Sequence, residues 1–337
     1  MNMVVTGHAW RCGSWLLLLA WAGASVSKTA PKFKTSTNQI GGQFVSVQYN
    51  GGRFGDNLMA VAHALYFAHK HHSRFLLSSF QYSDQLVLNS SGKLTSALAQ
   101  KLPKRLPING VRDFNHAPKE HPNILFEIPY FPESLIEHAG HTKPYFPVDW
   151  EDFGFLALLR TLIAPINRLS LVQPPKHQIS VAVHIRRGGR FDDVAAMQAA
   201  GQPELLYKFP LLAYYVEQLQ LVSELFAHAP LYVFIFTDDL NPIQLTQQIA
   251  TAVDRPNLTF DCRKTENHDR ANVLEDFFSL QQFDILIRPD SNFSLMAEKL
   301  GDFAAVITPG NFKAGLKVQY GQVTVRKSLA ALKTKYQ

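Results

Sequence analysis

The chain has 337 residues, more than one compact core usually holds, so two domains of about 150 residues each are expected. Hydrophobic residues make up 46% and charged residues 18% of it, which excludes an intrinsically disordered chain and a protein of many membrane spans. The 33 Lys and Arg against 27 Asp and Glu give a net charge of +6, which favours anionic partners.

Residues 1–24 have the pattern of a targeting segment. Arg11 precedes an apolar run from Trp15 to Ala22, and the small residues up to Ala24 fit a cleavage site. The run is shorter than the roughly 20 residues of a membrane span, so a cleaved signal peptide is favoured over a short anchor. We therefore expect a protein of the secretory route or one attached to a membrane. The alternative is a cytoplasmic protein whose start codon has been placed too far upstream. The polar residues 25–42 predict a flexible leader.

Residues 43–170 predict an N-terminal α/β domain with irregular connections. Gln43–Tyr49 alternates apolar and polar side chains as a strand does, and glycines follow it. Helical spacing then recurs from Leu58 onward, with Asp56 or Asn57 available as the N-cap. The later pattern predicts a strand at Ile124–Ile128 and a helix at Phe153–Leu169 that is interrupted at Pro165.

Residues 178–325 alternate apolar runs with helical periods more regularly, which predicts a parallel, doubly wound sheet. The expected strands are Ile179–Ile185, Leu231–Phe236, Leu258–Phe260, Phe283–Ile287 and Ala304–Ile307. The expected helices are Tyr207–Ala227, Asn241–Thr251, Asn272–Gln281 and Ser294–Leu300. Residues 326–337 are expected to form a basic C-terminal tail.

The residues that follow each apolar run are the candidate site residues, because ligands of parallel sheets bind at the carboxyl ends of the strands. Arg186 and Arg187 end one such run and precede glycines, which lets a ligand approach the backbone. Guanidinium groups bind phosphate bidentately and remain charged, so this place suits a diphosphate. Surface ion pairs are the alternative role for the two arginines. For His184 a hydrogen-bonded core histidine is favoured over a catalytic base, with a ribose or diphosphate contact also open.

A second candidate anion site lies at Ser291–Ser294, at the start of an expected helix. Hydroxyls and free backbone N–H groups meet the positive end of the helix dipole there. Simple N-capping by Ser291 or Asn292 is the alternative. Asp238 follows another apolar run, and capping of the next helix is its expected role. No Asp-x-Asp pair occurs and the two cysteines have no metal-ligand spacing, so we expect no metal.

Four segments resemble, in order, motifs of the α-1,2-fucosyltransferase family of glycosyltransferases, and more faintly those of α-1,6- and protein O-fucosyltransferases. Gly52-Arg53-Phe54-Gly55-Asp56-Asn57 is similar to the opening Gly-Arg-Leu-Gly-Asn-Gln, and His184-Ile185-Arg186-Arg187-Gly188 to the His-x-Arg-Arg-Gly core. Phe236-Thr237-Asp238-Asp239 is similar to Phe-Ser-Asp-Asp, and Ser291-Asn292-Phe293-Ser294 to Ser-Ser-Phe-Ser. Val306-Ile307-Thr308-Pro309 resembles the closing Val-Ile-x-Pro.

The resemblance implies a GT-B-like pair of Rossmann-type domains, the C-terminal one more regular and binding the GDP-sugar, the N-terminal one on the acceptor side. It implies an inverting transfer of fucose from GDP-fucose to a glycan hydroxyl, in an α-1,2 linkage to galactose, with no metal and no further cofactor. Arg186 would grip the diphosphate and act in catalysis. The implied substrate-binding residues are Arg53, Asn57, His184, Arg186, Arg187, Asp238, Ser291, Asn292, Phe293 and Ser294.

The chain departs from the family in and after these motifs, and Leu295-Met296-Ala297 replaces the family's Trp-rich continuation. Gly189 stands in place of an Asp, and Asp56 in place of an Asn. Asp193 or Asp192 is our candidate for the base that deprotonates the acceptor, with solvated loop carboxylates as the alternative. The departure at Gly189 keeps a second function open, a catalytically degenerate relative that binds a GDP-sugar or a glycan. Basic residues are scattered without an aromatic-interleaved motif, so no nucleic-acid partner is expected.

Overall fold

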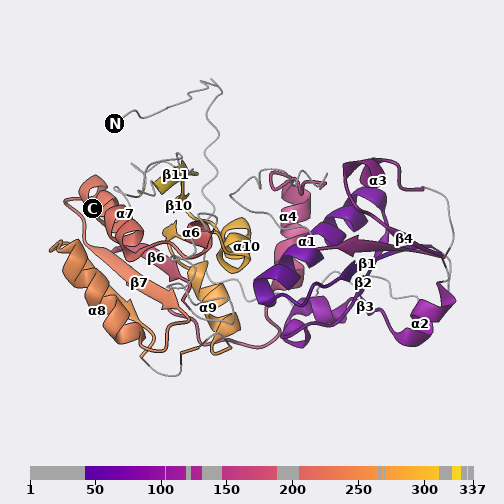
Figure 1. The fold of residues 1–337 in the computed structure, drawn as a ribbon, viewed down its shortest axis with the longest axis horizontal. Helices are drawn as coiled ribbons and strands as arrows, with labels where there is room; N and C mark the ends of the chain where they lie inside the picture. Colours follow the sequence, from indigo (N-terminus) through magenta and orange to yellow (C-terminus); the bar gives the residue numbers. More distant parts are fainter. Residues whose placement is uncertain are drawn as a thin grey trace, which may run out of the picture. The chain divides into compact units, whose positions relative to one another are not determined.

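The computed structural model describes residues 42–102, 104–118, 123–130, 146–187, 205–264, 267–268, 270–310, 321–327 and 332. All of them belong to one compact unit, residues 39–337. Two sheets with surrounding helices make up this unit (Figure 1). The predicted α/β fold class, with two Rossmann-like layers of mostly parallel strands, is confirmed.

The N-terminal sheet has the strand order β3-β2-β1-β5-β4, and its paired strands run parallel. The strands are β1 (Gln43–Gln48), β2 (Arg74–Leu77), β3 (Gly92–Lys93), β4 (Lys104–Pro107) and β5 (Ile124–Pro129). The central strand β1 buries Phe44 to Val47, as expected for a parallel strand covered on both faces. The edge strand β4 is mostly exposed and carries charges and a proline, which is why the sequence pattern did not reveal it.

The helices around this sheet are α1 (Phe54–His71), α2 (Ser96–Lys101), α3 (Val111–Asn115) and α4 (Phe153–Ile163), with 3₁₀ turns at Ser83–Gln85 and Val87–Ser90. The predicted N-cap of α1 was wrong, because Arg53 is the N-cap and Asp56 reaches back to its backbone N–H at 3.2 Å. Helix α4 ends at Ile163 and does not resume after Pro165, since proline breaks the helical hydrogen bonding.

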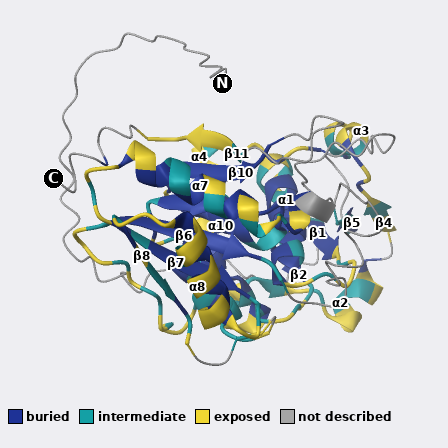
Figure 2. Ribbon diagram, turned by 60° about the vertical axis from the view of Figure 1, so that its left-hand side comes forward, coloured by how far each residue is buried: buried dark blue, intermediate teal, exposed yellow. Residues whose placement is uncertain are grey.

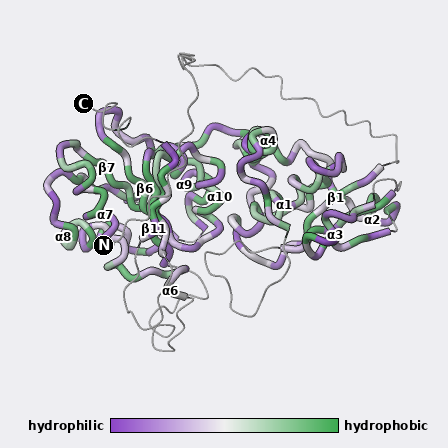
Figure 3. The backbone as a smooth tube through the Cα atoms, turned by 90° about the horizontal axis from the view of Figure 1, so that it is seen from above, coloured by the Kyte–Doolittle hydropathy of each residue, from purple (hydrophilic) through white to green (hydrophobic). Residues whose placement is uncertain are grey.

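The C-terminal sheet has the order β11-β10-β9-β6-β7-β8, and only the pair β10–β11 is antiparallel. Its strands are β6 (Ile179–Ile185), β7 (Leu231–Thr237), β8 (Leu258–Cys262), β9 (Ile285–Ile287), β10 (Ala305–Pro309) and β11 (Gly321–Val325). Counted along the chain, the five parallel strands have the order 3-2-1-4-5 of a nucleotide-binding doubly wound sheet. Strands β6 and β7 are hydrophobic and almost wholly buried (Figures 2 and 3).

The helices of this part are α6 (Leu205–Lys208), α7 (Leu212–Leu225), α8 (Pro242–Val253), α9 (Val273–Leu280) and α10 (Asn292–Leu300). Their bounds match the predictions within a few residues except at Tyr207–Ala227, which is divided into α6 and α7. Pro210 causes the division, because it lacks an N–H group and disfavours helical geometry in Phe209. Helix α8 exposes one face and buries Leu245, Ile249 and Val253, as an amphipathic surface helix does.

His63 is a buried histidine in the middle of α1, with 1% of its surface exposed. Its Nδ1 lies 2.9 Å from the carbonyl oxygen of Met59, and its ring packs edge-on against Phe146. Burial lowers the pKa of His63 to about 4, against a small opposing effect of the Met59 hydrogen bond. The side chain is therefore neutral in the folded protein at pH 7.

We expect acid to unfold the protein partly through His63. The unfolded chain takes up this proton near pH 6.5 and the folded chain only near pH 4. Stability is therefore lost as the pH falls through this window, by up to about 3 kcal/mol from this group. In urea titrations at several pH values, His63→Asn should show a shallower loss of stability between these limits. The same change at the exposed His177 is the control, and an unchanged slope in His63→Asn would contradict the expectation.

Candidate functional site at the carboxyl ends of two sheets

Each sheet has one place where the chain connections leave a strand in opposite directions. In the C-terminal sheet this switch point lies between β6 and β9, and in the N-terminal sheet between β1 and β5. Crevices at such points are where doubly wound sheets bind ligands. The segments that follow these strands contain Arg186, Ser291, Arg53 and Tyr130.

A pocket of about 500 Å³ lies at these strand ends. It brings together seven of the predicted residues, namely Arg53, His184, Arg186, Asp238, Ser291, Asn292 and Phe293. The pocket wall does not include Asn57, Arg187 or Ser294, but each of them is hydrogen-bonded to a residue of the wall. Asn57, for example, donates from Nδ2 to the Gly52 carbonyl at 3.2 Å. Asp192 and Asp193, the predicted base candidates, and Gly189 lie outside the described residues.

The N-termini of α1 and α10 meet at this pocket. Gly55 in the first turn of α1 packs directly on α10, since a Cβ on Gly55 would lie 2.3 Å from the backbone nitrogen of Phe293. Only glycine permits this approach. The N-cap residue of α10 is Ser291, and its side chain makes no capping hydrogen bond. Two positive helix ends therefore face one pocket, an arrangement that favours an anionic ligand.

His184 connects strand β6 to the first turn of α10. Its Nδ1 lies 2.8 Å from Ser294 Oγ, and only 8% of the residue is exposed. Ser294 Oγ also donates to the carbonyl oxygen of Ser291 at 3.3 Å. Burial lowers the pKa of His184, and the nearby arginines lower it further against the opposing charge of Asp238. His184 is thus a neutral, hydrogen-bonded histidine that also forms part of the pocket wall.

Asp238 holds the two arginine-bearing segments together. Its Oδ1 accepts the backbone N–H of Arg187 at 2.6 Å, and its Oδ2 lies 3.6 Å from Nη1 of Arg53. The expected capping role for Asp238 was wrong, because the N-cap of α8 is Asn241 and its N–H donates to Asp239 at 2.7 Å. The side chain of Arg187 points to Asp239, with 3.9 Å between Nε and Oδ2.

Arg186 lies in the pocket with its guanidinium over an aromatic ring. The guanidinium carbon is 5.0 Å from the ring centre of Phe209, a cation–π contact that helps to hold the group in place. The division between α6 and α7 at Pro210 places Phe209 there. An arginine orientated in this way suits bidentate binding of phosphate oxygens.

No protein-family model and no curated protein matches the chain. Solved structures similar to it include POFUT1 in complex with GDP-fucose, with a TM-score of 0.44, 13% identity and coverage of 80% of this chain and 96% of that one. NodZ α-1,6-fucosyltransferase, known from Bradyrhizobium, has a TM-score of 0.44, 13% identity and coverage of 84% and 99%. A mutant of Arabidopsis thaliana FUT1 in complex with GDP has a TM-score of 0.49, 12% identity and coverage of 83% and 73%.

All three are fucosyltransferases. This is the class of enzyme that the motifs of the chain resemble.

The motifs did not reveal Asp276, which lines the pocket from α9. Burial raises the pKa of Asp276 to about 6, although Arg263 opposes the shift by a short contact between its Nε and Asp276 Oδ1. In the sequence, Asp276 follows Glu275, and the pair indicates only an acidic first turn of a helix. Tyr82, His268 and Arg270 complete this side of the pocket, also without a sequence signal.

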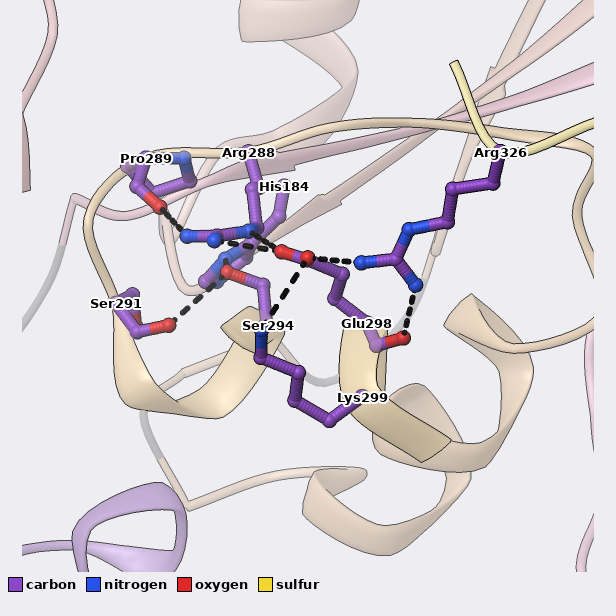
Figure 4. A network of polar contacts seen from close by, with 8 residues as sticks. All are labelled: His184, Arg288, Pro289, Ser291, Ser294, Glu298, Lys299 and Arg326. Atoms are coloured by element: carbon purple, nitrogen blue, oxygen red, sulfur yellow. Dashed lines mark hydrogen bonds and ion pairs between the residues drawn. The ribbon is translucent and has the colours of Figure 1, made fainter. Parts of the chain in front are cut away.

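An ionic network surrounds Glu298 in the last turn of α10, with its Arg288–Glu298 pair buried (Figure 4). Nε and Nη2 of Arg288 both lie 2.6 Å from Oε2 of Glu298, and Nη1 donates to the Pro289 carbonyl at 3.0 Å. Arg326 contacts the other carboxylate oxygen of Glu298, and its Nη1 donates to the Glu298 carbonyl at 3.1 Å. Arg326 begins the segment expected as a basic tail, and here its guanidinium is fixed against α10.

The described part of the chain contains no cluster of three His, Cys, Asp or Glu side chains that could hold a metal ion. Among the same residues, no helix combines the length and the hydrophobicity needed to cross a membrane.

Proposed function

We propose that the chain is a glycosyltransferase that moves fucose from GDP-fucose to a hydroxyl group of a glycan. One observation carries the proposal: Arg53, Arg186 and the N-termini of α1 and α10 converge on one pocket at the carboxyl ends of two sheets. This combination fits a nucleoside diphosphate, because fixed guanidinium groups and free helix N–H groups both bind phosphate oxygens.

The same groups suit the transfer step. When the glycosyl bond breaks, negative charge grows on the leaving diphosphate, and Arg186 would stabilise this charge most in the transition state. The N–H groups at the start of α10, positioned by the His184–Ser294 hydrogen bond, would add to this effect. The contribution of these groups at the diphosphate is thus electrostatic.

Asp276 supports guanine as the nucleobase of the donor. Guanine presents two neighbouring N–H donors, and a carboxylate accepts such a pair well. Arg263 orientates this carboxylate from behind, because its Nε contacts Oδ1. We therefore propose that the guanine ring binds near α9 and the diphosphate between Arg186 and α10, both within the one pocket.

The finer features of the proposal depend on the order of the motifs. They are inversion at the sugar carbon, no requirement for a metal, and an α-1,2 linkage to galactose. Asp193, or Asp192, is proposed as the base that deprotonates the acceptor hydroxyl. We also propose that residues 1–24 direct the protein to the secretory route or to a membrane.

A second candidate function is a catalytically degenerate relative that binds a GDP-sugar or a glycan without transfer. Gly189, in place of the Asp of the related motif, favours it. Titration calorimetry with GDP, GDP-fucose, GDP-mannose and UDP, followed by assays of GDP release with and without galactosides, separates the candidates. We expect saturable binding of GDP and GDP-fucose, weaker binding of UDP, and galactoside-dependent release of GDP. Binding without release would support the degenerate relative. No binding of any nucleotide would contradict fucosyl transfer and leave only the glycan-binding form of the second candidate.

A further inference from the structure

Asp56 places a negative charge at the meeting point of the two helix N-termini. It lines the pocket from the first turn of α1. Its Oδ1 accepts the side-chain N–H of Asn292 at 2.7 Å and the hydroxyl of Tyr130 at 3.2 Å, and its Oδ2 accepts the backbone N–H of Arg53. The carboxylate folds back over Gly52, where a Cβ would lie 2.5 Å from Oδ2. The position is therefore defined by four neighbouring groups.

Asp56 differs from the other two carboxylates of the described pocket. Asp238 lies 3.6 Å from the guanidinium of Arg53, and Asp276 contacts the guanidinium of Arg263. Within the described residues, the groups that hold the Asp56 carboxylate are an amide, a hydroxyl and a backbone N–H, all of them neutral. These donors and the positive helix ends stabilise the carboxylate, which keeps its negative charge. That charge acts across the pocket on any anion that binds there.

The negative charge of Asp56 repels the two nucleotides of the proposed reaction, GDP-fucose and GDP, to different extents. In GDP-fucose the outer phosphate is esterified, whereas transfer breaks the sugar–oxygen bond and leaves GDP with a terminal phosphate. Near pH 8 that phosphate carries one further negative charge, since its last pKa is about 6. A fixed carboxylate repels the product more strongly than the donor.

We propose that Asp56 is a specificity-determining residue that makes the pocket prefer the esterified donor over the free diphosphate and so favours release of the product. This rests on the proposed function, because it requires both nucleotides to bind here. Tyr130 and Asn292, which come from β5's end and α10, act as positioning residues for the carboxylate.

The test is titration calorimetry of GDP and GDP-fucose with the wild type and with Asp56→Asn, at low salt and near pH 8. Asparagine keeps the shape and the acceptor oxygen for Asn292 and Tyr130. It removes the charge and, with it, the second oxygen, which accepts the Arg53 N–H. We expect the ratio of the GDP Kd to the GDP-fucose Kd to fall by roughly threefold to tenfold. At about 1 M salt, where the screening length is about 3 Å, the change should largely disappear.

Asp254→Asn is the matched control, because Asp254 is exposed after α8 and outside the pocket, and this variant should keep the wild-type ratio. Asp56→Ser is a second neutral variant in case Asp56→Asn does not fold, and it should shift the ratio in the same direction. A ratio that stays constant in the folded variants, with both affinities changed equally, would overturn the proposal. Wild-type protein that binds neither nucleotide would instead contradict the proposed function.

Discussion

Arg186→Ala is expected to weaken GDP binding by about tenfold to about 150-fold, which corresponds to the loss of one bidentate phosphate contact worth about 1.5 to 3 kcal/mol. Arg186 lines the pocket with its guanidinium held over Phe209, which reduces the conformational entropy lost when the phosphate contact forms. Alanine removes both the charge and the two parallel N–H groups. Transfer should fall further than binding, because the charge on the leaving diphosphate is largest in the transition state.

Titration calorimetry measures the binding loss, and thermal unfolding checks that the variant remains folded. Arg186→Lys should recover part of the affinity but not all, since an ammonium group keeps the charge without the fork. Arg105→Ala is the matched control, because Arg105 is half exposed, pairs with Glu127 and does not line the pocket. GDP binding by Arg186→Ala at wild-type strength would remove Arg186 from the phosphate site.

Glu298→Ala is expected to have the largest effect on stability, about 3 to 5 kcal/mol in the free energy of unfolding. Glu298 is 6% exposed and Arg288 is 3% exposed, so the substitution leaves the Arg288 charge buried without its carboxylate. The contact of Arg326 with α10 is lost at the same time. Urea denaturation at pH 7 measures the change.

Two comparisons test this explanation. Glu224→Ala breaks the ion pair with Arg255, but Glu224 is 63% exposed, and a loss of at most about 1 kcal/mol is expected. The double variant Arg288→Met, Glu298→Leu removes both buried charges and should be more stable than Glu298→Ala, since no unpaired charge remains in the interior. If the double variant lost as much stability as the sum of its single changes, the cost would lie in packing and not in charge.

The C-terminal sheet could be predicted because its signal is local. Ile179–Ile185 is a nearly continuous apolar run and Leu231–Phe236 a second one, and the structure buries almost all of both. Such runs stand out from the helical periods between them. In the N-terminal sheet, β3 has two residues and β4 exposes most of its side chains. Neither has enough buried positions to produce a periodic pattern, so the sequence predicted only β1 and β5 there.

The sequence alone was enough to predict the strands that precede Arg186, Asp238 and Ser291, and the carboxyl-end rule gathers their segments at one sheet edge. Three contacts became visible only in the folded protein: the hydrogen bond between Asp56 and Asn292, 236 positions apart, the pairing of Glu298 with two arginines, and the place of Asp276 in the pocket wall. The physical reason is that periodicity reports which face of an element is buried, whereas these contacts join side chains of different elements and leave no repeating pattern along the chain.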